Sequence, residues 1–393
     1  MGSNISRRDI LKLLSVAGGT TAVMLARRLM HVQPEEAKGG ELTPQVYLPF
    51  IGRYHGSLDG KVIHILSTHA TNWTGQTAFW QYVNQPAVDD MVNRGVMELT
   101  GASTVADAWR MLIPFYEPGQ KIAIKVNFNN NQSCNNVNGV IDALVQPVNS
   151  VVSGLELIGV PRANVCVYDA VRAIPQRFVD GGLAGISYYD NSCRNQAGFS
   201  NDSSSNVTFY PPPGVSMPIE KVTNVLMNAA YLINMPIMKG GHPIAGVTLG
   251  AKNHFGTIHQ CSAIHDYVNT VSKPPAYNQN YSPFVDFLRS PLIGGKTVLT
   301  IGDGLFAARQ FNNKPAVWST FGNHVPNSLF FATDPVSIDC VMHDFLAAEL
   351  GSGLTSTANR YLQLAGNAGV GVYESVNPWT QTYTNINYTK VVQ

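Results

Sequence analysis

The residues best suited to chemistry stand close together in the segment INMPIMKGGHPIAGVTLGAKNHFGTIH, residues 233–259. A lysine can bind an anion or capture a carbonyl as an imine, an amide can orient a substrate, and an imidazole can move a proton. The segment supplies these groups from Lys239, His242, Lys252, Asn253, His254 and His259. This combination predicts a polar ligand site.

Five glycines interrupt the same segment, at positions 240, 241, 246, 250 and 256. A glycine within a helix costs up to about 1 kcal/mol relative to alanine, so their presence predicts that a ligand or a neighbouring strand approaches the backbone closely. We expect a strand that ends at Asn234, a glycine-rich loop over residues 239–242, and a helix over residues 246–256. Thr248 and Lys252 would lie one turn apart on that helix.

The histidines of this region do not have the spacing of a zinc site. His242, His254, His259 and His265 give the spacing H-x11-H-x4-H-x5-H, which matches no standard zinc pattern. A lone buried or exposed histidine is the common alternative for each. His254 is the favoured functional candidate because it directly follows Lys252 and Asn253.

Further polar groups follow other predicted strands. In a parallel sheet, ligands bind beyond the carboxyl ends of the strands. The residues expected there are Lys125, Asn127, Asn129, Asp169, Arg172, Asn234, Asp303, Asp334 and Asp339. Lys125 stands out because its neighbours are apolar, and an unpaired ammonium group is costly to bury. Lys125 therefore needs either a partner of opposite charge or a functional role.

Three of these carboxylates allow a second interpretation of the site. With His254, the side chains of Asp303, Asp334 and Asp339 could supply oxygen and imidazole ligands to a divalent metal ion. The simpler interpretations are that Asp334, which precedes Pro335, caps a helix and that Asp303, which precedes Gly304, forms a turn. The run of asparagines at 129–131 could likewise be a solvated loop.

An α/β fold would position these side chains. Short strand-like runs start at Lys61, Lys121, Asn164, Tyr231, Thr297 and Ser328, and amphipathic helix-like stretches cover residues 141–159 and 335–350. Nearly continuous apolar strands separated by helices predict a mostly parallel sheet with helices on both faces.

The domain organisation follows from shifts in composition. We expect an export signal at 1–30, a linker at 31–60 and an α/β domain at 61–350. Residues 191–218, rich in Asn, Ser and Pro, would form a small β or loop insertion. Residues 351–393 would form a helix and a tail packed on the same domain.

The first residues predict export. SRRDILK (6–12) precedes a run of about 14 apolar residues, a twin-arginine type of signal that is shorter than the roughly 20 residues needed to span a bilayer. The protein would use the twin-arginine export machinery and work in the periplasm, on the cell surface or outside the cell. Arg27 and Arg28 close the apolar run without an A-x-A site, so an uncleaved membrane anchor is the alternative.

Composition excludes some partners and cofactors. The net charge is +1, so the 393-residue chain lacks the basic surface of a nucleic-acid-binding protein. Its five cysteines have no C-x-x-C spacing, so no iron–sulfur cluster is expected. Outside the cytoplasm some cysteines can pair, and the odd number leaves at least one free. Twin-arginine export, which carries folded proteins, favours a bound cofactor without identifying it.

Five blocks of the sequence resemble a known family. KIAIKVN, LINMPIMKGGH, GAKNHFG, IGDG and ATDPVSID are similar in order and spacing to the family catalogued as domain of unknown function 362. The resemblance spans about residues 61–350 and implies functional positions at Lys125, Asn127, Asn234, Lys239, Lys252, Asn253, Asp303, Asp334 and Asp339. Some relatives carry ferredoxin-type cysteine clusters that this chain lacks, which argues against electron transfer. The family's chemistry is unsettled and supplies no mechanism.

Three functions remain open from the sequence. The favoured one is an exported enzyme in which lysines bind a small anionic or polyhydroxylated substrate, asparagines orient it, and Asp303 or His254 moves a proton. The second adds a divalent metal ion, and the third is a ligand-binding protein without catalysis. The favoured function predicts that Lys125, Lys239, Lys252, Asn127 and Asp303 line one pocket. The sequence does not give the oligomeric state.

Overall fold

The computed structural model describes residues 60–393. The predicted export signal and nearly all of the predicted linker lie outside the described residues. Within residues 60–393, no helix has both the length and the apolar character needed to cross a membrane.

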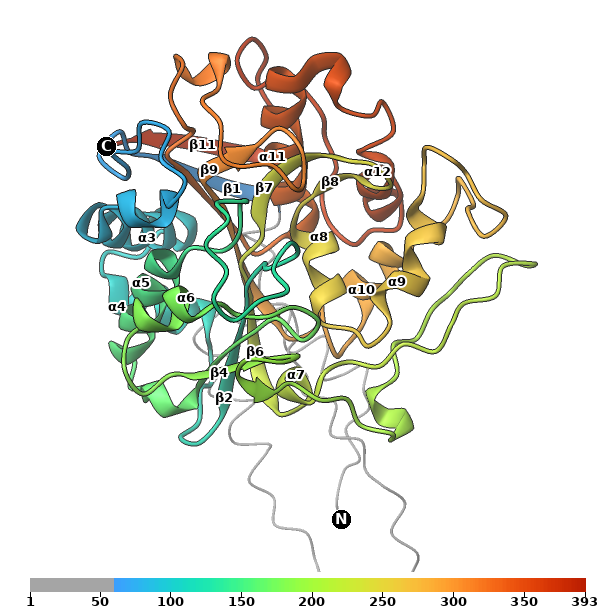
Figure 1. Ribbon diagram of the computed structural model, residues 1–393, viewed down its shortest axis with the longest axis horizontal. Helices are drawn as coiled ribbons and strands as arrows, with labels where there is room; N and C mark the ends of the chain where they lie inside the picture. The colour runs from blue at the N-terminus through green and yellow to red at the C-terminus, as the bar shows by residue number, and fades with distance from the viewer. Residues whose placement is uncertain (1–59) are drawn as a thin grey trace, which may run out of the picture. The chain divides into compact units, whose positions relative to one another are not determined.

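The strands of the described chain form one mixed, mostly parallel sheet, in the order β11-β1-β10-β9-β6-β2-β3-β4-β5 (Figure 1). β7 extends the sheet beside β9 and pairs with β8. Only β10, which pairs with β1 and β9, and β8 run antiparallel to their neighbours. The strands are β1 (Lys61–Leu66), β2 (Lys121–Lys125), β3 (Val165–Tyr168), β4 (Ser187–Asp190), β5 (Asn195–Gln196), β6 (Ala229–Asn234), β7 (Ile237–His242), β8 (Gly246–Thr248), β9 (Thr297–Ala308), β10 (Ser328–Ala332) and β11 (Asn387–Val392).

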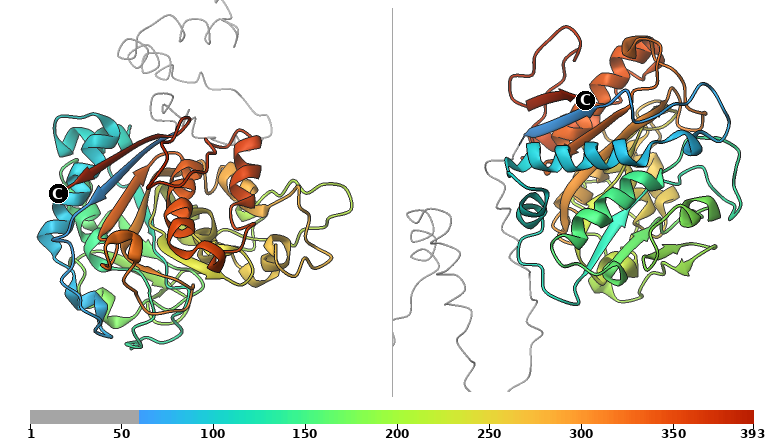
Figure 2. Two further views of the ribbon diagram at one scale, coloured as in Figure 1. Left: turned by 90° about the horizontal axis from the view of Figure 1, so that it is seen from above. Right: turned by 90° about the vertical axis from the view of Figure 1, so that its left-hand side faces the viewer.

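Helices cover both faces of the sheet, as Figures 1 and 2 show. One face carries α3 (Gln85–Thr100), α4 (Val105–Leu112), α5 (Val145–Glu156) and α6 (Gln176–Asp180). The other carries α7 (Asn224–Met227), α8 (Gly250–Asn253), α9 (Cys261–Ile264), α10 (Pro283–Arg289), α11 (Pro335–Leu350) and α12 (Arg360–Asn367). This arrangement confirms the predicted α/β class, because strands covered on both sides are the reason for the nearly continuous apolar runs.

The alternation of side chains along β2 decides which way the site faces. Ile122 and Ile124 belong to the core beneath α3–α6, whereas Ala123 belongs to the core beneath α7–α12. Successive side chains of a strand point to opposite faces. Lys125, the last residue of β2, therefore points toward α8 and α11.

The segment 239–256 differs from the prediction. Residues 237–242 and 246–248 form an antiparallel hairpin, with Lys239 opposite Thr248, in place of a loop and the first half of a helix. The helix is confined to α8 and a following 3-10 turn, His254–Gly256. Gly246 has a φ of +76°, which permits the turn between the strands. A short glycine-rich apolar run carries too little periodicity to distinguish these two structures.

The chain after α11 returns to the sheet. α12 packs against α10 and α11, and β11 pairs in parallel with β1 along the sheet edge. Residues 191–218 contain β5 and a 3-10 turn, Ser203–Ser205. Just inside this segment, Cys193 forms a disulfide with Cys134, whereas Cys166, Cys261 and Cys340 are free.

Candidate functional site

Asn253 is the centre of a buried network at the carboxyl ends of β2 and β6. Its Oδ1 accepts hydrogen bonds from Lys125 Nζ at 3.2 Å and from Asn127 Nδ2 at 3.0 Å. Its Nδ2 donates to Asn234 Oδ1 at 2.8 Å. These four side chains are buried, and the network joins α8 to the sheet. We call the network and Lys239, which extends it, the lysine–asparagine cluster.

Lys125 has the partner that its burial requires. Its Nζ lies 3.3 Å from Asp169 Oδ2 and also donates to the carbonyl oxygen of Val126. Burial lowers the pKa of Lys125, and the Asp169 carboxylate offsets part of that change. Lys125 is therefore a structural ion-pair partner within the cluster.

The backbone passes close to this ion pair at Gly256. A Cβ added at Gly256 would lie 2.5 Å from Lys125 Nζ and 2.5 Å from Asp169 Oδ1. Real Cβ atoms do not approach other atoms this closely, so a side chain here would displace the ion pair. This glycine is thus required by the close approach of other protein groups, and no ligand is needed to account for it.

Lys239 extends the cluster toward the loop that follows β2. Its Nζ donates to Asn127 Oδ1 at 2.8 Å, and no carboxylate of residues 60–393 lies within ion-pair distance of it. Burial lowers the pKa of Lys239 to about 7, which the Asp142 carboxylate partly offsets and the charge of Lys252 reinforces. Both protonation states of Lys239 are therefore populated near neutral pH.

Lys252 is the least satisfied of the three lysines. It is 4% exposed, yet within the described part of the chain its ammonium group has neither a hydrogen-bond acceptor nor a carboxylate partner. Its contact is with the ring of Phe255, whose centroid lies 4.6 Å from Nζ. Burial lowers the pKa of Lys252 to about 8, and the charge of Arg172 contributes in the same direction.

Asp339 holds α8, and with it Lys252 and Asn253, in place. Its Oδ1 accepts from the backbone N–H of Gly250 at 2.7 Å and its Oδ2 from that of Ala251 at 2.9 Å, at the N-terminal end of α8. The Tyr361 hydroxyl donates to Oδ2 at 2.9 Å. With both oxygens engaged, Asp339 acts as a positioning residue, and its pKa is raised to about 6 by burial.

The three carboxylates predicted as metal ligands are not brought together. Asp334 is the N-cap of α11, and its oxygens accept from the backbone of Val336, Ser337 and Val372. Asp303 lies on the opposite face from Lys125, because the flanking glycines of β9 point toward Met342 and Met238. No group of three His, Cys, Asp or Glu side chains in residues 60–393 has the geometry of a metal site.

Asp303 is also separate from the lysine–asparagine cluster, contrary to the prediction of one shared pocket. Burial raises its pKa to about 7, and the only offset comes from the backbone N–H of Leu305, which donates to Oδ1 at 3.0 Å. The register of a strand explains the difference. Asp303 is one residue out of phase with the positions of β9 that face α11.

His242 and His254, the buried histidines near the cluster, are uncharged at neutral pH. His242 Nδ1 accepts from the backbone N–H groups of Ile244 and Ala245, and burial lowers its pKa to about 2. Burial, together with the charge of Lys125, lowers the pKa of His254 to about 3. His259 is exposed. A neutral imidazole adds no positive charge to the site and can accept a proton only weakly at these pKa values.

Arg172 and Asn129 lie beside the cluster. The Arg172 Nε donates to the carbonyl oxygen of Asn129 at 2.7 Å, and the guanidinium has no carboxylate partner among the described residues. Asn129 thus contributes its backbone rather than its amide.

Burial raises the pKa of the half-buried Cys261 thiol, and the charges of Arg172 and Lys252 partly offset this rise. Cys261, Asp142 and Tyr361 were missed from the sequence, since none belongs to a recognisable motif.

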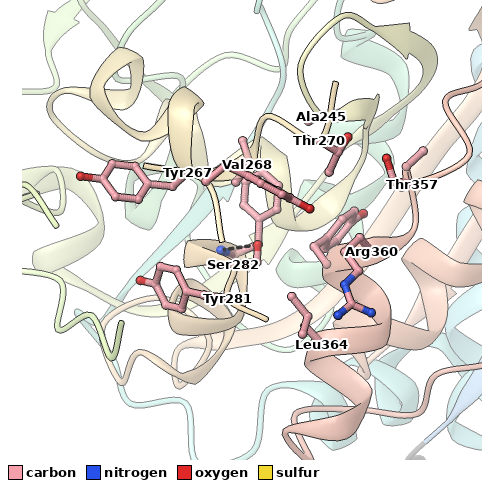
Figure 3. A pocket seen from close by; sticks show the side chains of 13 residues that line it. Ala245, Tyr267, Val268, Thr270, Tyr281, Ser282, Thr357, Arg360 and Leu364 are labelled. Atoms are coloured by element: carbon pink, nitrogen blue, oxygen red, sulfur yellow. Dashed lines mark hydrogen bonds between the residues drawn. The ribbon is translucent and has the colours of Figure 1, made fainter. Parts of the chain in front are cut away.

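Two hollows in the described part of the protein lie away from the lysines. One, of about 20 Å³, lies beside α12 and is bordered by Tyr267, Tyr281 and Arg360 (Figure 3). It has room for roughly one water molecule. The other, of about 330 Å³, follows β1. Neither is lined by Lys125, Lys239 or Lys252.

Comparison with known proteins gives a family and no activity. A family described as "Domain of unknown function (DUF362)" matches residues 122–344. The matched range runs from β2 through most of α11 and includes every member of the lysine–asparagine cluster. No curated protein matches the sequence.

Proposed function

Since the chain belongs to the family of domain of unknown function 362, whose description assigns no activity, we propose from its site that it is an exported enzyme acting on a small anionic substrate. The substrate would bind at Lys252, Lys239 and Arg172. The observation that carries the proposal is Lys252, a residue only 4% exposed whose ammonium group has no hydrogen-bond acceptor or counter-charge in residues 60–393.

The charge of the region supports an anionic ligand. Lys125, Lys239, Lys252 and Arg172 bring up to four positive charges to the site, and Asp169 is the carboxylate in direct ion-pair contact with one of them. A buried cation without a partner is costly, and a bound carboxylate or phosphate would remove that cost. The neighbouring histidines do not compete for the anion, because their lowered pKa values leave them neutral.

The pKa values support proton transfer. An effective general acid or base has a pKa near the working pH, and those of Lys239 and Lys252 are about 7 and about 8. Either lysine could exchange a proton with a substrate bound between them. In its neutral form a lysine could also capture a substrate carbonyl as an imine. Asn127 Oδ1 accepts from Lys239 Nζ and holds that lysine in a fixed position, and Asn253 Oδ1 does the same for Lys125.

The disulfide supports export. Disulfides persist in oxidising compartments and are rare in the cytosol. The Cys134–Cys193 bond agrees with the twin-arginine pattern of residues 6–12. We therefore place the enzyme in the periplasm, on the cell surface or outside the cell.

Anion titration of the full chain tests the proposal. Phosphate and small mono- and dicarboxylates would be titrated by calorimetry into the wild-type protein, Lys252→Met and a matched control, Lys296→Met. Lys296 is a partly buried lysine whose Nζ donates to the carbonyl oxygens of Leu226 and Met227, away from the cluster. We expect Lys252→Met to weaken binding at least about tenfold, or 1.4 kcal/mol, and Lys296→Met to leave it unchanged.

Two results would count against this function. If no anion binds more tightly than about 1 mM, or if Lys252→Met binds as the wild type does, the anion site is absent. If anions bind at Lys252 but a broad substrate screen yields no turnover, the protein is a non-catalytic binding protein.

A further inference from the structure

A hollow of about 330 Å³ opens where β1 ends, apart from the lysine–asparagine cluster. Its walls come from the segment after β1, including Thr71 and Trp73, and from the loop between β9 and β10, including Phe321 and His324. Its volume is at the lower end of the range of about 300–1,000 Å³ that is typical of small-molecule sites. The hollow is therefore large enough for a ligand.

The lining selects for an uncharged, hydroxyl-rich ligand. No Asp, Glu, Lys or Arg lines the hollow, in contrast to the cluster. Hydroxyl and amide groups supply both donors and acceptors, and apolar rings supply contact area. The polar lining consists of Thr68, Thr71, Asn72, Thr74, His324 and Asn327.

Asn327 fixes a pair of hydrogen-bond donors at this hollow. Its Oδ1 accepts from the Thr71 hydroxyl at 2.7 Å, whereas its amide nitrogen has no partner among the described residues. Its backbone is held by bonds to Leu305 and Ser67, with a φ of +48°. A non-glycine residue in this conformation is uncommon and clusters at binding sites. The carboxamide is therefore oriented before any ligand arrives.

The aromatic side chains that line the hollow are also held in fixed positions. Trp73 Nε1 donates to the carbonyl oxygen of Gln76 at 2.6 Å, and its ring meets Phe306 edge to face at 5.7 Å. Phe321 packs on the ring of Trp318. Rigid aromatic side chains give large contact areas at little entropic cost.

We propose that this hollow is a binding site for a neutral saccharide of about one or two rings. The CH-rich face of a sugar ring would lie on Trp73 or Phe321, and its hydroxyl groups would accept from the Asn327 amide and exchange hydrogen bonds with the threonines. The site is separate from the anion site and does not depend on the activity proposed above.

The decisive variant is Asn327→Asp in the full chain. Aspartate tolerates the same backbone conformation and keeps the acceptor for Thr71, but it removes both amide donors and adds a charge. Cellobiose, maltose and N-acetylglucosamine would be titrated while tryptophan fluorescence is followed, since Trp73 is in the wall. We expect binding of at least one of these sugars to weaken tenfold or more in Asn327→Asp and also in His324→Ala.

Two controls distinguish loss of the sugar site from loss of the anion site and from unfolding. Lys252→Met should bind the sugar as the wild type does, so a failure of the anion proposal leaves this one standing. The urea midpoint of Asn327→Asp reports whether the variant is folded. The inference is overturned if none of the three sugars binds, if a charged probe such as phosphate binds here in their place, or if sugar binding is the same in Asn327→Asp and His324→Ala as in the wild type.

Discussion

Lys125 and Asn253 are 128 positions apart in the chain, yet Lys125 Nζ donates to Asn253 Oδ1 at 3.2 Å. The contact joins the end of a central strand to the short helix α8 that covers it. Asn127, two residues after Lys125, and Asn234, at the end of β6, bond the same amide. One buried carboxamide therefore satisfies three polar groups from the ends of two strands, β2 and β6, and its loss should affect both stability and ligand binding.

Asn253→Leu should be strongly destabilising. Leucine has the same branched arrangement of side-chain heavy atoms but leaves the polar groups of Lys125, Asn127 and Asn234 short of partners. An unsatisfied buried polar group costs about 1–3 kcal/mol, so we expect a loss of roughly 3–5 kcal/mol in the free energy of unfolding, measured with urea. Asn201→Ala, at an exposed position, is the control and should change stability by less than about 0.5 kcal/mol. A loss below about 1 kcal/mol in Asn253→Leu would show that the network is not important for stability.

Gly256→Ala should displace the Lys125–Asp169 ion pair. The added Cβ would lie 2.5 Å from atoms of both partners, and overpacking of this kind costs about 1–3 kcal/mol. Gly353→Ala is a matched control, because its Cβ would meet only Leu350, at 3.9 Å. Thermal unfolding of the two variants compares them directly. Equal midpoints would contradict the packing argument.

Lys239→Met should stabilise the protein near neutral pH, and its advantage over the wild type should fall as the pH rises. The pKa of Lys239 is about 7 in the folded protein against 10.5 in the unfolded chain, so the unfolded chain binds more protons between these values. The wild type therefore gains stability as the pH rises from 7 toward 10.5, whereas Lys239→Met lacks this contribution. The stability of the variant relative to the wild type should fall by roughly 3 kcal/mol between about pH 7 and 9.5. A difference that stays constant with pH would show that the pKa is not shifted.

The sequence predicted most of the lysine–asparagine cluster because its members follow strands that can be recognised by their apolar runs. β2, β6 and the helix α11 lie where the runs predicted, and parallel strands bring their carboxyl ends to one edge. The predictions were wrong for Asp303, which was expected in the shared pocket, and for the hairpin β7–β8, which was expected to be a loop and the start of a helix. A one-residue difference in phase moves a side chain to the other face, and a glycine-rich segment has no clear period. Asp339 was identified, but its role as the cap of α8 depends on tertiary contacts.

The disulfide should stabilise the loop that follows β2. It closes a segment of 59 residues between Cys134 and Cys193, for which the chain-entropy relation gives about 4 kcal/mol. Cys134→Ser with Cys193→Ser should lower the free energy of unfolding by about 2–4 kcal/mol, and dithiothreitol should lower that of the wild type but not of the double variant. Cys166→Ser, at a free cysteine, shows the effect of thiol loss alone. Equal sensitivity of both proteins to dithiothreitol would argue against the pairing.

Asp303→Asn should stabilise the protein above neutral pH. Burial raises the pKa of Asp303 from 3.8 to about 7, so the folded protein holds a proton there that the unfolded chain has lost. The wild type consequently loses stability as the pH rises from about 4 to 7, by up to roughly 4 kcal/mol, and stays at the lower level above pH 7. Asparagine carries no charge and keeps the acceptor for the Leu305 N–H. Urea unfolding at about pH 5 and pH 8.5 should therefore show a larger advantage for the variant at the higher pH. An equal advantage at both pH values would mean that Asp303 is ionised in the folded protein throughout this range.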